Sequence, residues 1–439
     1  MNGFGWLSVV RLGLVQASIG AVVVMTTSTL NRVMVVELAL PAVLPGSLVA
    51  LHYLVQIARP RMGYGSDLSP RRTPWIVGGM GLLATGGIAA ASATAWMGSH
   101  PATGIAAAVL AFLMIGLGVS AAGTSLLALL AQRVAPERRA SAATLVWLMM
   151  IAGFALTAGT AGSLLDPYSP DRLVAVTAAV SLVAFAITCL AMRGLEGSAA
   201  HAATHFAPPD GSAATTPGFA EALAQVWREP AARRFTIFVF VSMLAYSAQD
   251  LILEPFAGSA LGFTPGESTR LSGTQHGGVL LGMIAAALAG RRRFGSLMAW
   301  QVGGCLLSAL ALLGLVAAGM VGPAWPFRAN VFLLGAANGA FSIAAIAAMM
   351  KLANESSASR PGVRMGLWGA AQALAFGFGG LAGTVASDLA RLVIGTPALA
   401  YAAVFAGEAL LFVVAAALVA RGSSWQAHWK RGRPHESIA

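Results

Sequence analysis

Charged residues are scarce in this sequence. Asp, Glu, Lys and Arg make up only 10% of its 439 residues, whereas soluble domains usually carry about 25%. Hydrophobic residues make up 57%, and the 51 glycines give the apolar stretches the small side chains that let helices approach closely in lipid. This composition excludes a soluble enzyme and a disordered protein. It predicts an integral membrane protein.

Cysteine is nearly absent as well. The sequence has two, Cys189 and Cys305, and they lie in separate apolar segments, which excludes a secreted disulfide scaffold. The formal net charge is +11, but the basic residues form short clusters between apolar runs rather than one basic patch. We therefore expect the membrane, and no nucleic acid, to be their partner.

Twelve segments meet or approach the length of roughly 20 apolar residues that a spanning helix needs. They lie near residues 12–34, 41–58, 75–96, 104–131, 142–164, 172–192, 235–254, 271–290, 295–319, 326–350, 366–390 and 397–420. This count places 22 of the 27 basic residues on one side of the membrane and five on the other. By the positive-inside rule, the sequence predicts twelve spanning helices with both termini in the cytoplasm.

The longest polar stretch divides these segments six and six. We expect an N-terminal six-helix bundle over 1–193, a cytoplasmic linker over 194–234, a C-terminal six-helix bundle over 235–421 and a cytoplasmic tail over 422–439. Within the linker, Phe219 to Arg234 has the composition of a short amphipathic helix on the membrane surface. A shift of 221 residues places Trp147 on Trp368, Gly159 on Gly380 and Gly162 on Gly383. The halves are therefore predicted to be two parallel repeats in a major-facilitator-type bundle.

The connection between the second and third segments resembles a loop signature of major-facilitator transporters. It is carried by Gly63, Asp67, Arg71 and Arg72. The glycine permits a tight helix end, Asp67 is placed to pair with a basic or helix-terminal group, and the two arginines hold the loop inside. The alternative is an ordinary basic loop. The signature supports the fold and says little about a substrate.

Two of the apolar segments contain polar residues, which are costly in lipid and functional by default. They are Asn31, Arg32 and Glu37 in the first segment and Gln249, Asp250 and Glu254 in the seventh. Asp250 and Glu254 are four residues apart, so both carboxylates share one helical face. Because the two segments are repeat equivalents, we expect these groups to meet near the outer mouth of a central cleft. They would form a binding site, a gate or a structural ion-pair network.

Three more polar residues are isolated. Glu408 lies near the middle of the twelfth segment. Its two interpretations are a carboxylate that takes up a proton during transport and a side chain that makes a hydrogen bond between helices. His52 and His276 lie in the second and eighth segments, and a neutral imidazole suits the axial position on the magnesium of a chlorin. A polar packing contact is the alternative for both. We find no pair of aspartate-rich motifs, phosphate loop, nucleophile elbow, HExxH or CxxC, so we expect no catalysis.

Three polar runs inside apolar segments carry a family resemblance. They are Leu30–Leu38 with the following Arg59–Arg61 and Gly63–Arg72, then Gln249–Gly258, then Arg364–Ala373. These runs resemble the PucC/LhaA-like bacteriochlorophyll-delivery family of the major facilitator superfamily, over essentially the whole chain. Thr274–Gly278 is similar to the branch of that family encoded among pigment-biosynthesis genes.

The resemblance implies a factor that delivers bacteriochlorophyll during assembly of light-harvesting complexes. It implies bacteriochlorophyll as the ligand, with carotenoid or lipid as further ligands, and the bacteriochlorophyll synthase or antenna polypeptides as partners. The location implied is the bacterial inner, intracytoplasmic photosynthetic membrane. Trp368 and Gln372 join the polar residues of the first and seventh segments as pigment-binding or gate residues. Two alternatives stay open: a proton-coupled secondary transporter that uses Glu408, Asp250 or Glu254, and a pigment-free assembly scaffold.

Overall fold

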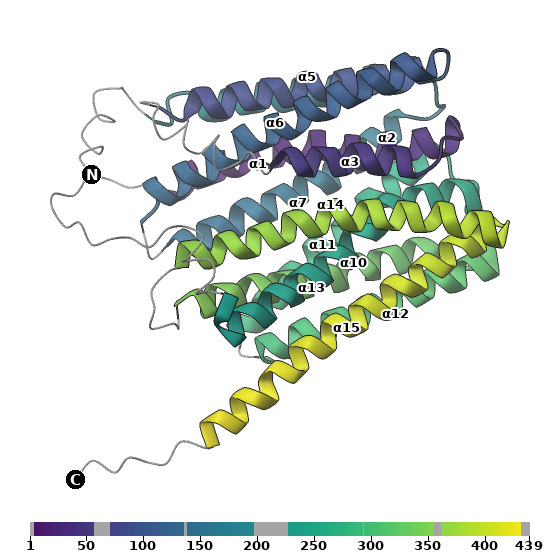
Figure 1. The fold of residues 1–439 in the computed structure, drawn as a ribbon. Helices are drawn as coiled ribbons and strands as arrows, with labels where there is room; N and C mark the ends of the chain where they lie inside the picture. Colours follow the sequence, from purple (N-terminus) through teal and green to yellow (C-terminus); the bar gives the residue numbers. More distant parts are fainter. Residues whose placement is uncertain are drawn as a thin grey trace, which may run out of the picture.

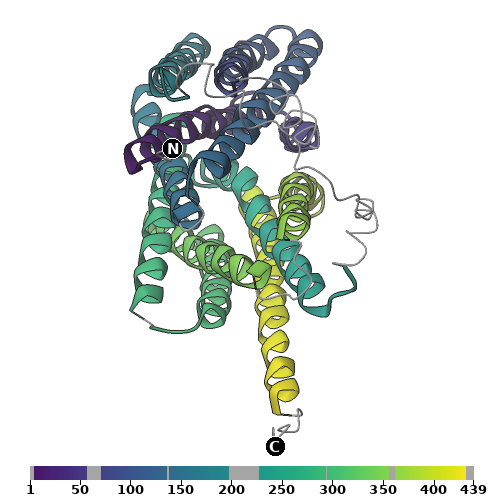
Figure 2. The ribbon, with the colours of Figure 1, turned by 90° about the vertical axis from the view of Figure 1, so that its left-hand side faces the viewer.

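The structure is a computed structural model that describes residues 4–56, 71–135, 138–196, 227–292, 294–354 and 361–431. Every regular element in these ranges is helical, and the long helices run side by side as one bundle (Figure 1). α1 begins and α15 ends at the same end of this bundle, which we call the near end; the opposite end is the far end. Seen from the near end, the helices of the N-terminal half lie above those of the C-terminal half (Figure 2).

The N-terminal half contains six helical segments. The first is α1 (Trp6–Val24) continued by the π-helical turn η1 (Met25–Thr29), by α2 (Leu30–Arg32) and by the π-helical turn η2 (Val33–Glu37). The others are α3 (Val43–Val55), α5 (Thr73–Met97), α6 (Pro101–Arg133), α7 (Arg139–Leu164) and α8 (Pro170–Met192).

The C-terminal half again contains six. They are α10 (Pro230–Leu261), α11 (Pro265–Arg291), α12 (Leu297–Val321), α13 (Phe327–Asn354), α14 (Pro361–Ile394) and α15 (Pro397–Arg431), with a short 3₁₀ turn, η7 (Gly322–Ala324), before α13. Four of the six begin at a proline. A proline fits there because the first amide of a helix has no intrahelical partner to lose.

Ten of the described helices are long and apolar enough to cross a membrane. The other two segments are α3, an apolar helix of 13 residues, and α11, whose 27 residues include Glu267, Arg270, Gln275 and His276. Together with these two, the ten give the twelve segments that the sequence predicts. The all-α, multi-pass membrane architecture is confirmed.

The same helix pairs pack in both halves. α1 packs against α7 and α8, as α10 packs against α14 and α15. α5 packs against α6 and α8, as α12 packs against α13 and α15. Between the halves, α3 packs against α14 and α7 packs against α11. This pairing confirms the two six-helix repeats.

Several helices extend beyond the apolar segments predicted for them. The sequence predicts the seventh helix over 235–254, whereas α10 begins at Pro230 and continues through Pro255 to Leu261. Hydropathy detects the apolar part of a helix, while the helix itself ends only where its backbone hydrogen bonds end. The remainder of the predicted amphipathic helix, residues 219–226, lies outside the described residues, as do Gly63 and Asp67.

Candidate functional site

The first spanning helix is locally widened where it faces the C-terminal half. The π-helical turns η1 and η2 enclose α2, and such turns occur often at functional sites. Asn31 and Arg32 of α2 are 1% and 2% exposed. Two strongly polar side chains are therefore buried between the halves, where groups of this kind need hydrogen-bond partners.

Asn31 replaces a hydrogen bond that Pro255 removes. In an α-helix the carbonyl of residue 251 accepts from the amide of residue 255, but proline has no N–H. The side-chain nitrogen of Asn31 donates to the Leu251 carbonyl oxygen instead, at 2.6 Å. A side chain of one half thus completes a helix of the other, and α10 continues past its internal proline.

Arg32 binds the backbone just beyond the carboxyl end of α10. Its guanidinium forms an ion pair with Glu37 and donates to the Phe263 carbonyl oxygen at 2.6 Å. Gly258 makes room for it, since a Cβ there would lie 3.0 Å from Arg32 Nη2. The last carbonyls of a helix carry partial negative charge, which favours a buried cation at this position.

Asp250 and Glu254 both face α11. Gln275 donates to Asp250 Oδ1 at 3.3 Å, and the Ser272 hydroxyl donates to Glu254. Two carboxyl groups four residues apart on α10 are thus held by two residues of one neighbouring helix. The polar groups of the first and seventh helices do gather at one interface. However, the bonds that Asn31 and Arg32 make across it go to backbone carbonyls and not to these carboxylates.

Gln249 and Glu408 lie inside the C-terminal half. They are 0% and 3% exposed, and their side-chain polar atoms have no hydrogen-bond partner among the described residues. Phe256, two turns after Gln249 on the same face of α10, packs against Phe405 of α15 with ring centroids 5.3 Å apart. Phe405 is three residues from Glu408, so Gln249 and Glu408 both lie on the side where α10 and α15 pack together. Gln249 therefore does not join Asp250 at the interface with the first helix.

His276 lies in the seam between α7 and α11, which we call the α7–α11 seam. Its Nδ1 is 2.8 Å from the Ser272 carbonyl oxygen, and its ring packs edge-on against Phe154 of α7, with centroids 5.0 Å apart. A carbonyl oxygen only accepts, so Nδ1 carries the proton and Nε2 presents its lone pair. Nε2 makes no hydrogen bond with the described residues. This is how metal-binding histidines are commonly held.

His52 is held differently. It is 2% exposed, and its Nε2 lies 3.0 Å from the side-chain nitrogen of Gln56. An amide nitrogen only donates, so this lone pair of His52 is already used. The described residues contain no group of three or more His, Cys, Asp or Glu side chains that could hold a metal ion on their own.

The remaining predicted residues are dispersed. Trp368 of α14 is 1% exposed and packs against Phe235 of α10, with ring centroids 5.1 Å apart. Its indole nitrogen has no hydrogen-bond partner among the described residues. Gln372, one turn further on, is half-buried. Of the four residues of the loop signature, the structure describes Arg71 and Arg72. Arg71 is exposed and Arg72 is buried, and both lie at the near end, directly before α5.

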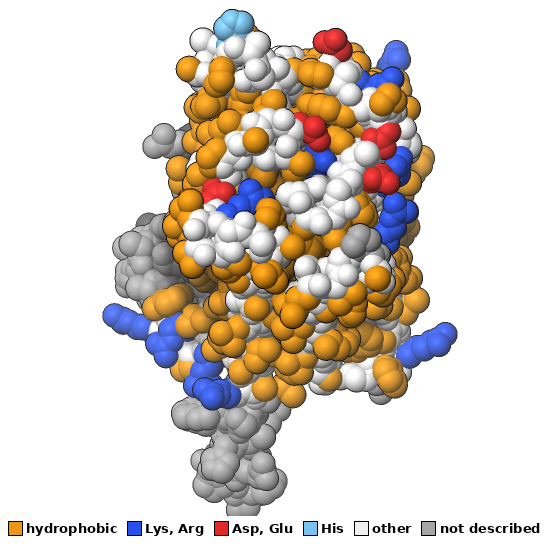
Figure 3. Space-filling view, turned by 90° about the vertical axis from the view of Figure 1, so that its right-hand side faces the viewer, with side chains coloured by type: hydrophobic (Ala, Val, Ile, Leu, Met, Phe, Trp, Pro, Cys, Tyr) orange, Lys and Arg blue, Asp and Glu red, His pale blue; other side chains and the backbone are white. Residues whose placement is uncertain are grey.

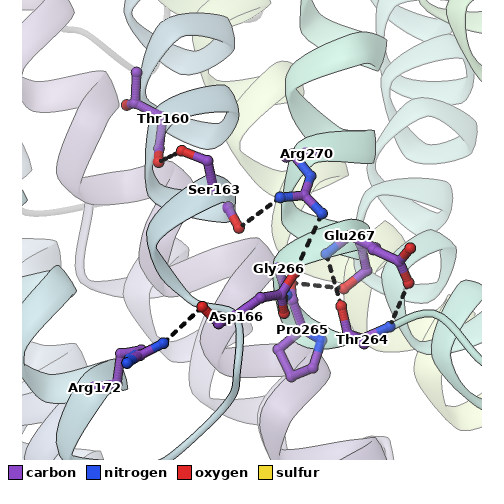
Figure 4. A network of polar contacts seen from close by, with 11 residues as sticks. Thr160, Ser163, Asp166, Arg172, Thr264, Pro265, Gly266, Glu267 and Arg270 are labelled. Atoms are coloured by element: carbon purple, nitrogen blue, oxygen red, sulfur yellow. Dashed lines mark hydrogen bonds and ion pairs between the residues drawn. The ribbon is translucent and has the colours of Figure 1, made fainter.

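An aspartate at the end of α7 binds the amino end of α11. Asp166 Oδ1 accepts from the Gly266 amide at 3.2 Å, and Asp166 Oδ2 pairs with Arg270 at 3.2 Å (Figure 4). Arg270 also donates to the Gly162 carbonyl oxygen at 3.4 Å. A carboxylate at a helix amino end is favoured by the helix dipole. We call this contact the Asp166 clasp.

A second aspartate forms the equivalent contact on the other side. Asp388 of α14 accepts from the amides of Ala42 and Val43, at 3.0 and 2.7 Å, where α3 begins. Each half thus offers one carboxylate to a helix amino end of the other half. Sequence reasoning missed both residues, although the repeat shift of 221 places Asp166 one position from Asp388. That match was the available signal.

The Asp166 clasp and the Asp388 contact, which we call the Asp388 clasp, both lie at the far end of the bundle. This end carries charges of both signs. Acidic and basic side chains lie next to one another there (Figure 3). Tyr168 lies in the connection between α7 and α8. Burial raises the pKa of its phenol above the usual value, and the negative charge of Glu37 raises it further, while Arg32 lowers it. The phenol is therefore neutral at physiological pH, next to the Arg32–Glu37 pair.

Known proteins are similar to this chain over nearly its whole length. A family model described as PUCC protein matches residues 29–424. A protein named "Bacteriochlorophyll synthase 44.5 kDa chain" from Rhodobacter capsulatus is 54% identical, over 94% of each chain. Protein PucC from Rhodobacter capsulatus is 32% identical, over 93% of this chain and 90% of that one.

Solved structures of membrane transporters share the fold. A D-xylose–proton symporter superposes with a TM-score of 0.69 at 15% identity, covering 94% of this chain and 97% of that one. A peptide transporter superposes with the same TM-score of 0.69 at 12% identity, covering 96% of both. At these identities the likeness concerns the fold alone, and it confirms the major-facilitator bundle.

Proposed function

The chain belongs to the PucC family, and from this premise we propose that it binds bacteriochlorophyll and delivers it during assembly of light-harvesting complexes. In this proposal the chain receives pigment from the bacteriochlorophyll synthase and hands it to antenna polypeptides. The name of the relative at 54% identity, a chain of bacteriochlorophyll synthase, supports the link to the synthase. The membrane would be the bacterial inner, intracytoplasmic photosynthetic membrane, with the near end in the cytoplasm.

The observation that carries the proposal is the state of His276. A chlorin magnesium needs one donor besides the four ring nitrogens, and a neutral imidazole nitrogen is a suitable one. Nε2 of His276 has its lone pair available, while Nδ1 is fixed by the Ser272 carbonyl oxygen. Bacteriochlorophyll, when bound, would supply the magnesium; the chain supplies the ligand and the apolar surroundings. His276 is thus the proposed ligand, in preference to His52.

The α7–α11 seam is also where a flat ring can be admitted from lipid. The helices touch there through glycines, since a Cβ on Gly273 would lie 2.8 Å from the Gly159 nitrogen. At this glycine contact few side chains interdigitate, which lets the two backbones approach closely. Further along the seam, Ile151 of α7 lies in one apolar cluster with Val279 and Met283 of α11. Leu156 of α7 and Leu281 of α11 are 69% and 52% exposed on either side of it and offer apolar surface to the pigment tail.

The polar interface around Asn31 and Arg32 serves as the gate in this proposal. Asn31 and Arg32 join the two halves through the carbonyl oxygens of Leu251 and Phe263. Together with Glu37 and the α10 carboxylates, they would shape, rather than coordinate, the bound ring. Trp368 and Gln372 are proposed to contact pigment from α14. Carotenoid and lipid are the further ligands proposed, on the strength of the family.

An absorption spectrum of the protein purified in mild detergent tests the proposal. We expect bacteriochlorophyll to copurify with the wild-type chain, to be lost from His276→Ala and to be retained by His52→Ala, the matched control. Added imidazole should restore binding to His276→Ala, because it supplies the missing nitrogen. Pigment retained by His276→Ala would refute His276 as the ligand. A colourless wild-type protein would refute pigment binding altogether.

A proton-coupled transporter of a small solute is the second candidate function. Its specific observation is Glu408, a buried carboxyl group whose oxygens have no partner among the described residues. Proton-driven uptake by vesicles containing the wild-type chain, lost in Glu408→Gln, would favour it over pigment delivery. A colourless protein that copurifies with antenna subunits would instead favour the scaffold. In all three proposals the chain is not itself an enzyme.

A further inference from the structure

The near end contains a cavity between α5 and α8. Its volume is about 310 Å³, and its lining includes Arg71, Thr73, Val77, Cys189, Met192 and Arg193. α5 begins at Thr73 and α8 ends at Met192, so the cavity lies where two spanning helices leave the hydrocarbon. This is the depth of the lipid headgroups.

Two arginines and one glutamate bring charge to the cavity, and among the described residues the glutamate does not pair with either arginine. Arg71 and Arg193 are both exposed, and neither guanidinium forms a hydrogen bond or an ion pair with the described residues. Glu196, the acidic residue of the lining, is already engaged: its oxygens accept from the amides of Arg72 and Thr73, at 3.0 and 2.6 Å. The Glu196 carboxylate therefore neutralises the amino end of α5 and not the two guanidinium groups.

The position of Arg193 is fixed by a neighbouring helix. Arg11 of α1 donates from Nε to the Ala191 carbonyl oxygen at 2.8 Å and from Nη2 to the Arg193 carbonyl oxygen at 2.5 Å. These bonds hold the end of α8 in place. The wall beneath the guanidinium groups is apolar, formed by Val77 and Met192.

We propose that this cavity binds the headgroup of an anionic phospholipid. Guanidinium groups recognise phosphate through charge-assisted hydrogen bonds, and basic pockets between helices at the cytoplasmic surface bind anionic headgroups. Arg71 and Arg193 would hold the phosphodiester, and Val77 and Met192 would contact the glycerol and the first acyl carbons. The site gives Arg71 of the fold signature a binding role. It is separate from the α7–α11 seam and does not depend on pigment.

Cys189 is a built-in reporter of this site. It lines the cavity and is half-buried, whereas Cys305, the other cysteine, is 0% exposed. An uncharged maleimide should therefore label Cys189 selectively in the full-length protein. In nanodiscs of phosphatidylglycerol we expect labelling about fivefold slower than in nanodiscs of phosphatidylcholine, because a bound headgroup covers the thiol.

The arginines decide between a site and a general surface effect. The double variant Arg71→Gln, Arg193→Gln should label at the same rate in both lipids and should lose copurified phosphatidylglycerol in native mass spectrometry. Arg228→Gln is the matched control, since Arg228 is an exposed arginine near the start of α10 that does not line the cavity. Unchanged thermal unfolding would show that the variants fold.

Three results would overturn the proposal. One is equal labelling of the wild type in the two lipids. Another is a lipid dependence that Arg228→Gln abolishes as strongly as the double variant does. The third is protection in phosphatidylcholine nanodiscs by inorganic phosphate or glycerol 3-phosphate at millimolar concentration, which would identify a soluble phosphate, and not a lipid, as the ligand.

Discussion

The bond between Asn31 and the Leu251 carbonyl oxygen predicts that the effect of one substitution depends on another. Asn31→Ala removes the donor and leaves a buried carbonyl unpaired, since Pro255 has no N–H to give. Pro255→Ala supplies that N–H within α10. The same Asn31→Ala substitution should then matter much less, because the carbonyl has its ordinary helical partner.

The magnitudes follow from the cost of an unpaired group. An unsatisfied buried acceptor costs about 1–3 kcal/mol, and interhelical hydrogen bonds in membrane proteins measure about 0.6 kcal/mol on average. We therefore expect Asn31→Ala to lower the free energy of unfolding by about 1–2 kcal/mol in the wild type and by about 0.5 kcal/mol or less in the Pro255→Ala background. The coupling energy of the cycle should be about 1 kcal/mol, which such cycles resolve.

Unfolding of the detergent-solubilised protein, followed by tryptophan fluorescence, measures the four free energies. Gln301→Ala is the matched control. Gln301 is buried and donates to the Ala344 carbonyl oxygen at 3.1 Å, but residue 348 is alanine, so that carbonyl also has its helical amide. Its cost should be the same with and without Pro255. An equal cost of Asn31→Ala in both backgrounds would refute the assignment of Asn31 as the replacement donor.

Two further predictions concern the contacts between the halves. Asp166→Asn and Asp388→Asn should each lower the free energy of unfolding by about 1 kcal/mol, because each removes a charge from a helix amino end; the losses should add, since the clasps join different helices. Thermal unfolding of the two single variants and the double variant checks this, and an unchanged midpoint in either single variant would count against its clasp. Gly273→Ala should destabilise the protein because its Cβ would lie 2.8 Å from a backbone nitrogen of α7. Gly277→Ala on the same helix has nothing within 4 Å and should stabilise it by about 0.5–1 kcal/mol. Equal effects of the two alanines would contradict glycine-mediated contact at the α7–α11 seam.

Much of the fold could be read from the sequence because lipid limits the choices. A chain in hydrocarbon must form its backbone hydrogen bonds within helices. The length of each apolar segment, and the preference of arginine for the cytoplasmic side of the membrane, therefore predict the number of helices. Helix ends were harder, since they depend on single contacts. The sequence predicts a stop before Pro255, and nothing local to α10 reveals that Asn31, more than 200 residues away, replaces the missing donor.

The site could be predicted by residue type but not by arrangement. Polar residues in apolar helices identify Asn31, Arg32, Asp250 and Glu254, which the structure places at one interface. The pattern does not tell that Gln249 points into the core of its own half, because consecutive helical residues differ by about 100° in direction. Nor does the pattern distinguish His52 from His276. The Nε2 lone pair of His52 accepts from Gln56, whereas the bond of His276 to the Ser272 carbonyl oxygen uses Nδ1 and leaves Nε2 available.

The two seams between the halves are equivalent in their clasps and different in their chemistry. α3 and α11 occupy equivalent places, each with its amino end bound by an aspartate of the other half. With the repeat shift of 221, His276 of α11 corresponds to Val55 of α3, whose side chain cannot bind a metal. Both seams thus have an aspartate that binds a helix amino end, while the proposed metal ligand, His276, lies in only one of the two. If pigment delivery depended only on a rocking motion that parts the two halves, pigment could pass through either seam equally. A ligand in the α7–α11 seam alone would instead make pigment enter and leave through that seam. We therefore expect pigment, and the partner that supplies or takes it, to meet the protein along α7 and α11.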